Sequence, residues 1–120
     1  MASLGMVGPF SFNKEMIESL LGDNVIGNYA LGYLNHSTNT FIVLYIGRSD
    51  KDLKKRLISH LDDKEQYKDF KFIKQNTIQN AYLCECKNYH DFGGDKGSLV
   101  NNNHPAKPET LAIRCPYCGK

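Results

Sequence analysis

The clearest pattern along the chain is a pair of apolar runs separated by a short polar segment. Residues 27–33 place aromatic and aliphatic side chains after a glycine, which is typical of a β-strand. Residues 41–48 begin with a run rich in β-branched side chains that is bounded by Gly47. The segment 35–40 between them consists of turn-forming residues. This order predicts a β-hairpin.

The spacing of apolar side chains becomes helical directly after the hairpin. They recur three and four residues apart at Leu53, Leu57, Ile58 and Leu61. We therefore expect a helix over residues 53–60, capped by Ser49 or Asp50. Arg56 and His60 are four residues apart, so they share one face of this helix.

Three further elements complete the predicted order. Asn13 is placed to cap a first helix that ends at Gly22, whereas the residues before Pro9 are expected to be irregular. Alternation over residues 69–74 predicts a third strand. Thr77 then precedes a helical pattern over residues 78–90, and the tail from residue 101 has no clear period. This order predicts an α+β domain with a mainly antiparallel sheet.

Composition narrows the class of protein. The 120 residues suit one domain, and 41% hydrophobic with 23% charged residues is typical of soluble globular proteins. A net charge of +2 permits a nucleic-acid partner without requiring one. No apolar run approaches the ~18 residues of a membrane span, and the start of the chain lacks the pattern of a signal peptide. We expect a cytoplasmic protein with reduced cysteines.

An acidic residue interrupts the apolar face of the last predicted helix. The face consists of Ile78, Ala81, Tyr82, Glu85 and Tyr89. A carboxylate buried there would need a paired charge or a metal ion. The other interpretation is that the buried face is rotated toward Leu83 and Cys86, which leaves Glu85 in solvent. The pattern alone leaves both open.

The four cysteines predict a structural zinc site. Cys115 and Cys118 have the spacing of half a zinc knuckle, although redox dithiols share it. Cys86 and His90 are four residues apart on the last predicted helix and complete a set of three thiolates and one imidazole. His104 is the competitor for the fourth ligand position.

Cys84 lies about 200° around that helix from Cys86. It is expected to be a small buried side chain rather than a ligand. A thiol redox protein is a weaker interpretation of Cys115 and Cys118, because the expected strand–CxxC–helix context is missing.

Two triplets in the predicted hairpin resemble the paired signatures of the GIY-YIG nuclease family. They are Gly27–Tyr29, Gly-Asn-Tyr, and Tyr45–Gly47, Tyr-Ile-Gly. Arg48, Arg56 and His60 match the basic residues that follow the second triplet in that family. The resemblance covers about residues 27–103. Asn28 departs from the family's isoleucine at the least chemical of the three positions.

The resemblance implies a three-stranded sheet flanked by helices and a DNA endonuclease that uses one Mg²⁺ or Mn²⁺ ion. Glu85 takes the position of the family's metal ligand. Asn103 takes that of a site asparagine, with Asn101 and Asn102 as the other candidates. Tyr29 would be the general base, provided that the arginines and the metal lower its pKa.

The remaining matched residues have supporting roles in the same expectation. Tyr45 would position the attacking water, and His60 would hold a tyrosine hydroxyl. Arg48 and Arg56 would stabilise negative charge on the phosphate.

The sequence thus predicts a single GIY-YIG-like domain over residues 1–120, with a core at about 24–104 and a zinc-stapled tail over 105–120. DNA is the expected substrate, with a dimer or a protein partner as a possible source of specificity. The alternative is a catalytically inactive, zinc-containing nucleic-acid-binding module on the same scaffold. The intact set of Tyr29, Tyr45, Arg56 and Glu85 favours the enzyme.

Overall fold

The predicted hairpin is present in the computed structural model, which describes residues 5–62, 67–92 and 115–116. Strands β2 (Gly27–Asn35) and β3 (Thr40–Ser49) pair antiparallel from the turn to the pair Gly27 and Ser49. One irregularity interrupts the ladder: Gly32 pairs with Val43 and Leu31 with Tyr45, which leaves Leu44 as a β-bulge. The hairpin therefore consists of two regular segments on either side of the bulge.

The described part of the chain has a four-stranded antiparallel sheet in the order β1-β4-β2-β3. Strand β4 (Asp69–Lys74) pairs with β2 and has the predicted bounds. Strand β1 (Val7–Ser11) pairs with β4, so the expectations of three strands and of an irregular start before Pro9 were wrong. Pro9 lacks an N–H donor, and for this reason the sequence did not indicate a strand here. An edge strand, however, tolerates proline. The sheet thus ends in β1 on one side and in β3 on the other.

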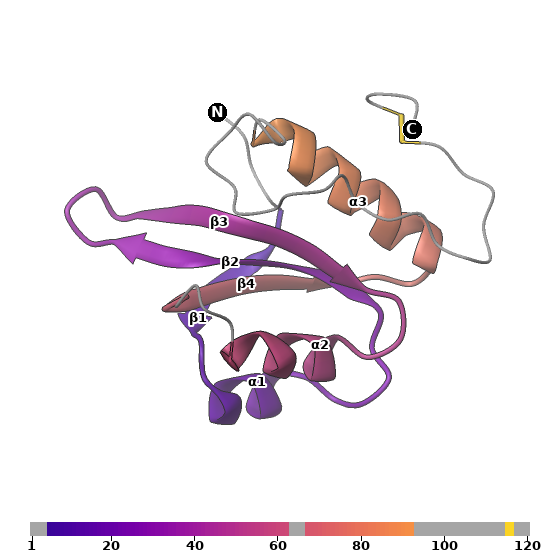
Figure 1. Ribbon diagram of the computed structural model, residues 1–120, viewed down its shortest axis with the longest axis horizontal. Helices are drawn as coiled ribbons and strands as arrows, with labels where there is room; N and C mark the ends of the chain where they lie inside the picture. Colours follow the sequence, from indigo (N-terminus) through magenta and orange to yellow (C-terminus); the bar gives the residue numbers. More distant parts are fainter. Residues whose placement is uncertain (1–4, 63–66, 93–114, 117–120) are drawn as a thin grey trace.

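Helices cover both faces of this sheet (Figure 1). Helix α3 (Ile78–Asp91) packs on one face, whereas α1 (Lys14–Leu20) and α2 (Leu53–Ser59) pack on the other. A short 3₁₀ turn (His60–Asp62) continues α2. None of the helices in these ranges is long and apolar enough to cross a membrane.

The two faces of β2 contribute to two separate cores, because side chains alternate along a strand. The larger core lies under α1 and α2 and is built around Ile17, Leu21, Tyr29, Leu31, Leu53, Leu57, Tyr67, Phe70 and Phe72. The smaller core, on the α3 side, contains Ala30, Val43 and Ile46, with Phe92 packed against it. Helix α1 thus covers the sheet through Ile17.

Side-chain caps fix where each helix begins. Asn13 caps α1, as predicted, and Thr77 caps α3, each by accepting a hydrogen bond from a backbone amide three residues on. The cap of α2 is Asp52 rather than Ser49 or Asp50. Ser49 is still part of β3, and its hydroxyl accepts the amide of Asp52 at 2.9 Å, while Asp50 pairs with Arg48.

Candidate active site

Three aromatic rings meet on the α2 side of the sheet, each from a different element. The Tyr29 hydroxyl of β2 lies 2.6 Å from Nε2 of His60, in the turn after α2. Tyr45 of β3 stacks on Tyr29 with ring centroids 6.2 Å apart and lies 4.9 Å from the His60 ring. Tyr29 is fully buried and His60 is 8% exposed. The hairpin and α2 thus bring three predicted site residues together.

The second signature glycine gives Tyr29 its path across the sheet. Gly47 is the cross-strand partner of Tyr29, and a Cβ at position 47 would overlap the Tyr29 ring and its hydroxyl oxygen. Because β3 is the last strand of the sheet, the Tyr29 ring lies over the edge strand while it remains fully buried. The first signature glycine is equally constrained: a Cβ at Gly27 would lie 2.5 Å from the Ile73 carbonyl oxygen. Close steric contacts therefore explain why both positions are occupied by glycine.

Arg56 of α2 adds a cation beside the tyrosines. Its guanidinium is within hydrogen-bonding reach of Tyr29 and Tyr45, and its pKa is raised chiefly by Tyr29. Burial raises the pKa of Tyr29 well above its usual range; Tyr45 adds to this, and Arg56 opposes it without reversing it. Arg56 therefore does not offset the effect of burial, and the pKa of Tyr29 stays above its ordinary value, contrary to what a phenolate base requires.

Glu85 is buried, which decides between the two interpretations of the last helix. It is 8% exposed, on the face of α3 that also buries Ala81 and Tyr82. Its Oε1 accepts a hydrogen bond from Nη1 of Arg48 at 2.5 Å. Burial raises the pKa of Glu85 to about 7, although Arg48 acts to lower it. A buried acid with a pKa near neutrality is typical of a functional site.

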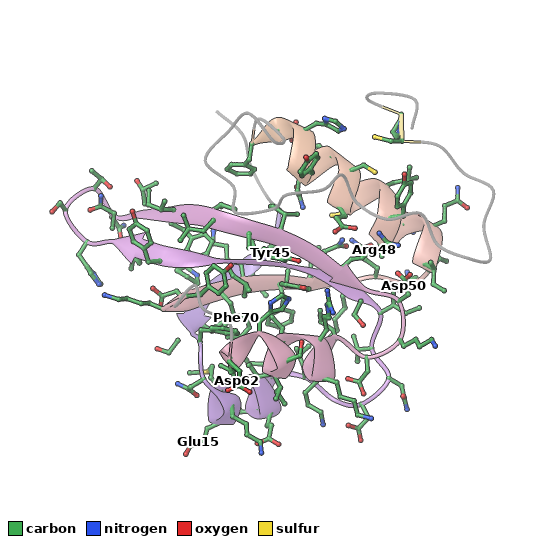
Figure 2. The ribbon with its side chains drawn as sticks, viewed as in Figure 1. Glu15, Tyr45, Arg48, Asp50, Asp62 and Phe70 are labelled. Atoms are coloured by element: carbon green, nitrogen blue, oxygen red, sulfur yellow. The ribbon has the colours of Figure 1, made fainter. Side chains whose placement is uncertain are left out.

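Arg48 holds this carboxylate from the end of β3, and Figure 2 shows Arg48 between the sheet and α3. Its Nε also donates to Asp50 at 2.9 Å, and its guanidinium lies 5.2 Å from the centroid of the Tyr82 ring. Burial lowers the pKa of Arg48, but the hydrogen bond to Asp50 and the charge of Glu85 raise it overall. Asp50 was not among the site residues predicted from the sequence. It pairs with Arg48, two residues before it, and no local sequence pattern identifies an acid with such a partner.

The two groups of side chains are close enough to act on one another electrostatically. Glu85 contributes to raising the pKa of Tyr29, and Arg56 contributes to lowering that of Glu85. Tyr29 and Arg56 belong to the α2 side and Glu85 to the α3 side, so the candidate site lies where the two faces meet at β3. Six predicted residues gather there: Tyr29, Tyr45, Arg48, Arg56, His60 and Glu85. The predicted Asn103, with Asn101 and Asn102, lies outside the described residues.

The residues present fit a divalent metal ion in one respect. Glu85 provides a single, largely buried carboxylate, and Mg²⁺ binds well to one carboxylate because it keeps much of its water shell. Arg48 holds one oxygen of that carboxylate here. Asp50 gives Arg48 a second partner, so the arginine remains neutralised if it releases Glu85.

A second cluster lies on another part of α3. Cys86 and Cys115 are buried together with Tyr82, and the thiol of Cys86 interacts with the side chains of both. Burial raises the pKa of Cys86 to about 12. Cys118 and His104 lie outside the described residues, and within the described ranges there is no group of three or more His, Cys, Asp or Glu side chains placed to hold a metal ion.

Cys84 differs from its prediction. It is half-buried rather than buried, and its Sγ accepts a hydrogen bond from Nδ2 of Asn88 at 3.5 Å. The position on α3 opposite Cys86 is therefore not fully covered by the sheet.

Sequence reasoning also gave no role to Asn28, the residue between the first signature glycine and Tyr29. Its side chain is fully buried and bonds to Ala81 and Gln75. A polar side chain in a strand whose neighbours are buried is the signal that could have identified it.

Comparison of the chain with protein-family models, with curated proteins and with solved structures gave no match.

Proposed function

We propose that the protein is a metal-dependent DNA endonuclease that hydrolyses phosphodiester bonds with a site of the GIY-YIG type. The observation that carries the proposal is the buried hydrogen bond between Tyr29 and His60 at the edge of the sheet, with Arg56 beside it and Glu85 within electrostatic range. Phosphodiester hydrolysis requires a proton acceptor, a cation for the phosphate and an acidic metal ligand. These side chains supply all three.

Tyr29 acts in this proposal as a neutral phenol rather than as a phenolate. Burial raises its pKa, so a relay agrees better with its surroundings. The Tyr29 oxygen takes a proton from the attacking water while its own proton passes to Nε2 of His60, 2.6 Å away. The water oxygen then bonds to phosphorus, the bond to the leaving oxygen breaks, and that oxygen takes a proton from solvent.

The other side chains orient the reactants. Tyr45 stacks beside Tyr29 and is placed to position the water, and Arg56 can reach a non-bridging phosphate oxygen with its planar guanidinium. A divalent ion bound at Glu85 would supply Lewis-acid stabilisation of the phosphoryl and leaving oxygens. Arg48 orients the Glu85 carboxylate. When that carboxylate binds another ligand, Arg48 gives up its hydrogen bond to Glu85 and keeps Asp50 as its partner.

We also propose that Cys86, His90, Cys115 and Cys118 bind one structural zinc ion. The support is the buried contact between Cys86 and Cys115, which brings together residues 29 positions apart in the chain. A thiol with the pKa of Cys86 stays protonated by itself, whereas a coordinating thiol is deprotonated outright by zinc. Such a site would fasten residue 115 to α3.

Incubation of the purified protein with DNA tests the endonuclease. Single-stranded, duplex and branched DNA are each offered with Mg²⁺ or Mn²⁺, against a chelator control and the Glu85→Gln variant. Cleavage that needs the metal and Glu85 is the expected result. Binding without cleavage of any substrate would favour the inactive nucleic-acid-binding module, and cleavage that survives in chelator would contradict the proposed mechanism.

A further inference from the structure

Asn28 connects the strand that carries Tyr29 to the helix that carries Glu85. Its side-chain Nδ2 donates to the backbone carbonyl of Ala81 in α3 at 2.8 Å. Its Oδ1 accepts from Nε2 of Gln75, in the segment that leads into α3, at 2.9 Å. Both polar ends of this fully buried amide are therefore used.

The surroundings of Asn28 make the amide unusual. Its neighbour on the same face of β2 is Ala30, which packs in the apolar cluster with Val43 and Ile46. An apolar side chain at position 28 would suit burial against a helix equally well and would need no partner. What an amide adds is direction, because a hydrogen bond fixes one register between strand and helix whereas apolar packing permits several.

The hydrogen bond from Asn28 fixes the position of the helical turn of α3 that leads to Glu85. In an α-helix the carbonyl of residue 81 also accepts the amide of residue 85. Asn28 and Arg48 are cross-strand partners in β2 and β3, so they stand side by side on one face. Asn28 bonds α3 at Ala81, and Arg48 bonds it one turn later at Glu85. Two neighbouring side chains of the sheet thus hold two consecutive turns of the helix.

We propose that Asn28 is a positioning residue that sets the height and rotation of α3 on the hairpin and so places the Glu85 carboxylate opposite Tyr29. This inference rests on the proposed endonuclease function. Asn28 touches no reacting atom and acts through Ala81 and the helix. The strand residue directly before the proton-accepting tyrosine therefore also determines where the acidic ligand stands.

The test must separate positioning from stability. Asn28→Leu keeps the number and branching of the side-chain heavy atoms but leaves the Gln75 amide without its acceptor, so the informative protein is the double variant Asn28→Leu/Gln75→Leu. Asn88→Leu is the matched control, since Asn88 is about equally buried and, among the described residues, its side chain bonds only to Cys84 within α3.

We expect the double variant to unfold at close to the parent temperature and to bind DNA with unchanged affinity. Its single-turnover cleavage should fall at least tenfold, and the Mg²⁺ concentration for half-maximal rate should rise at least tenfold. Asn88→Leu should change both by less than threefold. Parent-like cleavage and metal dependence in the folded double variant would overturn the proposal.

A measurement that does not use activity keeps the two proposals distinguishable. Residual dipolar couplings of backbone amides give the orientation of α3 relative to β2 and β3. We expect this orientation to change in the double variant and to stay the same in Asn88→Leu. An unchanged orientation would overturn the positioning role even if cleavage were lost. Failure of the parent protein to cleave DNA would refute the endonuclease alone, because the couplings would still decide the role of Asn28.

Discussion

The Tyr29 hydroxyl and Nε2 of His60 are 2.6 Å apart in a buried contact between β2 and the turn after α2. A phenol in this position can receive a proton and pass one on without becoming charged for long. The distance is short enough for direct transfer between the two atoms. The proposed mechanism depends on this contact more than on any other in the site.

Removal of the Tyr29 hydroxyl should therefore be costly. Tyr29→Phe keeps the ring and should lower the single-turnover cleavage rate on the order of 10² or more. Tyr33→Phe is the control, since Tyr33 lies on the same strand but is 40% exposed, and it should have little effect. His60→Ala should add little to Tyr29→Phe, because both changes break one relay. Equal small effects of the two phenylalanine variants would show that Tyr29 is structural.

The pH dependence of stability without metal should report on Glu85. Burial raises its pKa from the ordinary 4.5 to about 7, so the folded protein holds this proton more tightly than the unfolded chain does. The stability that this group contributes is fully present below pH 4.5 and is lost as pH rises through 7.

Denaturant unfolding in chelator checks this expectation. The parent should lose on the order of 1–3 kcal/mol relative to Glu85→Gln between pH 4.5 and 8. Curves that stay parallel over this range would mean that the ionised carboxylate is not penalised in the fold. In the presence of Mg²⁺ the same variant should show no cleavage.

A methyl group at position 47 should disturb the site sterically. Gly47→Ala places a Cβ against the Tyr29 ring, and overpacking of this kind costs about 1–3 kcal/mol. Displacement of Tyr29 should also reduce cleavage more than the loss of stability explains. Gly22→Ala is the control, because a Cβ there meets no atom within 4 Å. Chemical denaturation and cleavage rates measure both, and a neutral Gly47→Ala would contradict the close contact.

Zinc content should depend on two of the three described cysteines. Protein purified without chelator should contain about one zinc ion, with Zn–S distances of ~2.3 Å by X-ray absorption. Cys86→Ser and Cys115→Ser should each lose the metal and lower the unfolding temperature. Cys84→Ser should retain it, since Cys84 bonds to Asn88 and not to Cys115. The absence of zinc from the parent protein would refute the site.

Local patterns predicted the elements that local physics determines. The hairpin, β4 and the cap Asn13 follow from alternation, turn residues and side-chain oxygens, all of which act over a few residues. The cap of α2 was ambiguous in the sequence because residues 49–52 hold three possible cap residues, and only the length of β3 decides among them. Strand β1 was missed because its pairing partner β4 lies some 60 residues away in the chain, and because its own sequence has no alternation of hydrophobic and polar residues that would indicate a strand.

The candidate site shows the same division. The positions of Tyr29, Tyr45, Arg56 and His60 could be anticipated, since a hairpin followed by a helix brings them to one side. The ion pair between Arg48 and Glu85 joins residues 37 positions apart, and the burial that perturbs both arises only when α3 docks. Asn28 looked like a neutral departure from a pattern because its partners lie 47 and 53 positions away.

The single unpaired residue Leu44 decides which side chain Tyr29 meets. On the turn side of it, pairing continues from Asn35 and Thr40 to Gly32 and Val43; on the far side every partner is shifted by one. Without that offset, Ile46 and not Gly47 would stand opposite Tyr29, and the tyrosine could not cross the strand. A register without the bulge, in which Leu44 pairs with Leu31, would therefore retain every residue of both signature triplets and still exclude the Tyr29 ring from the space over Gly47.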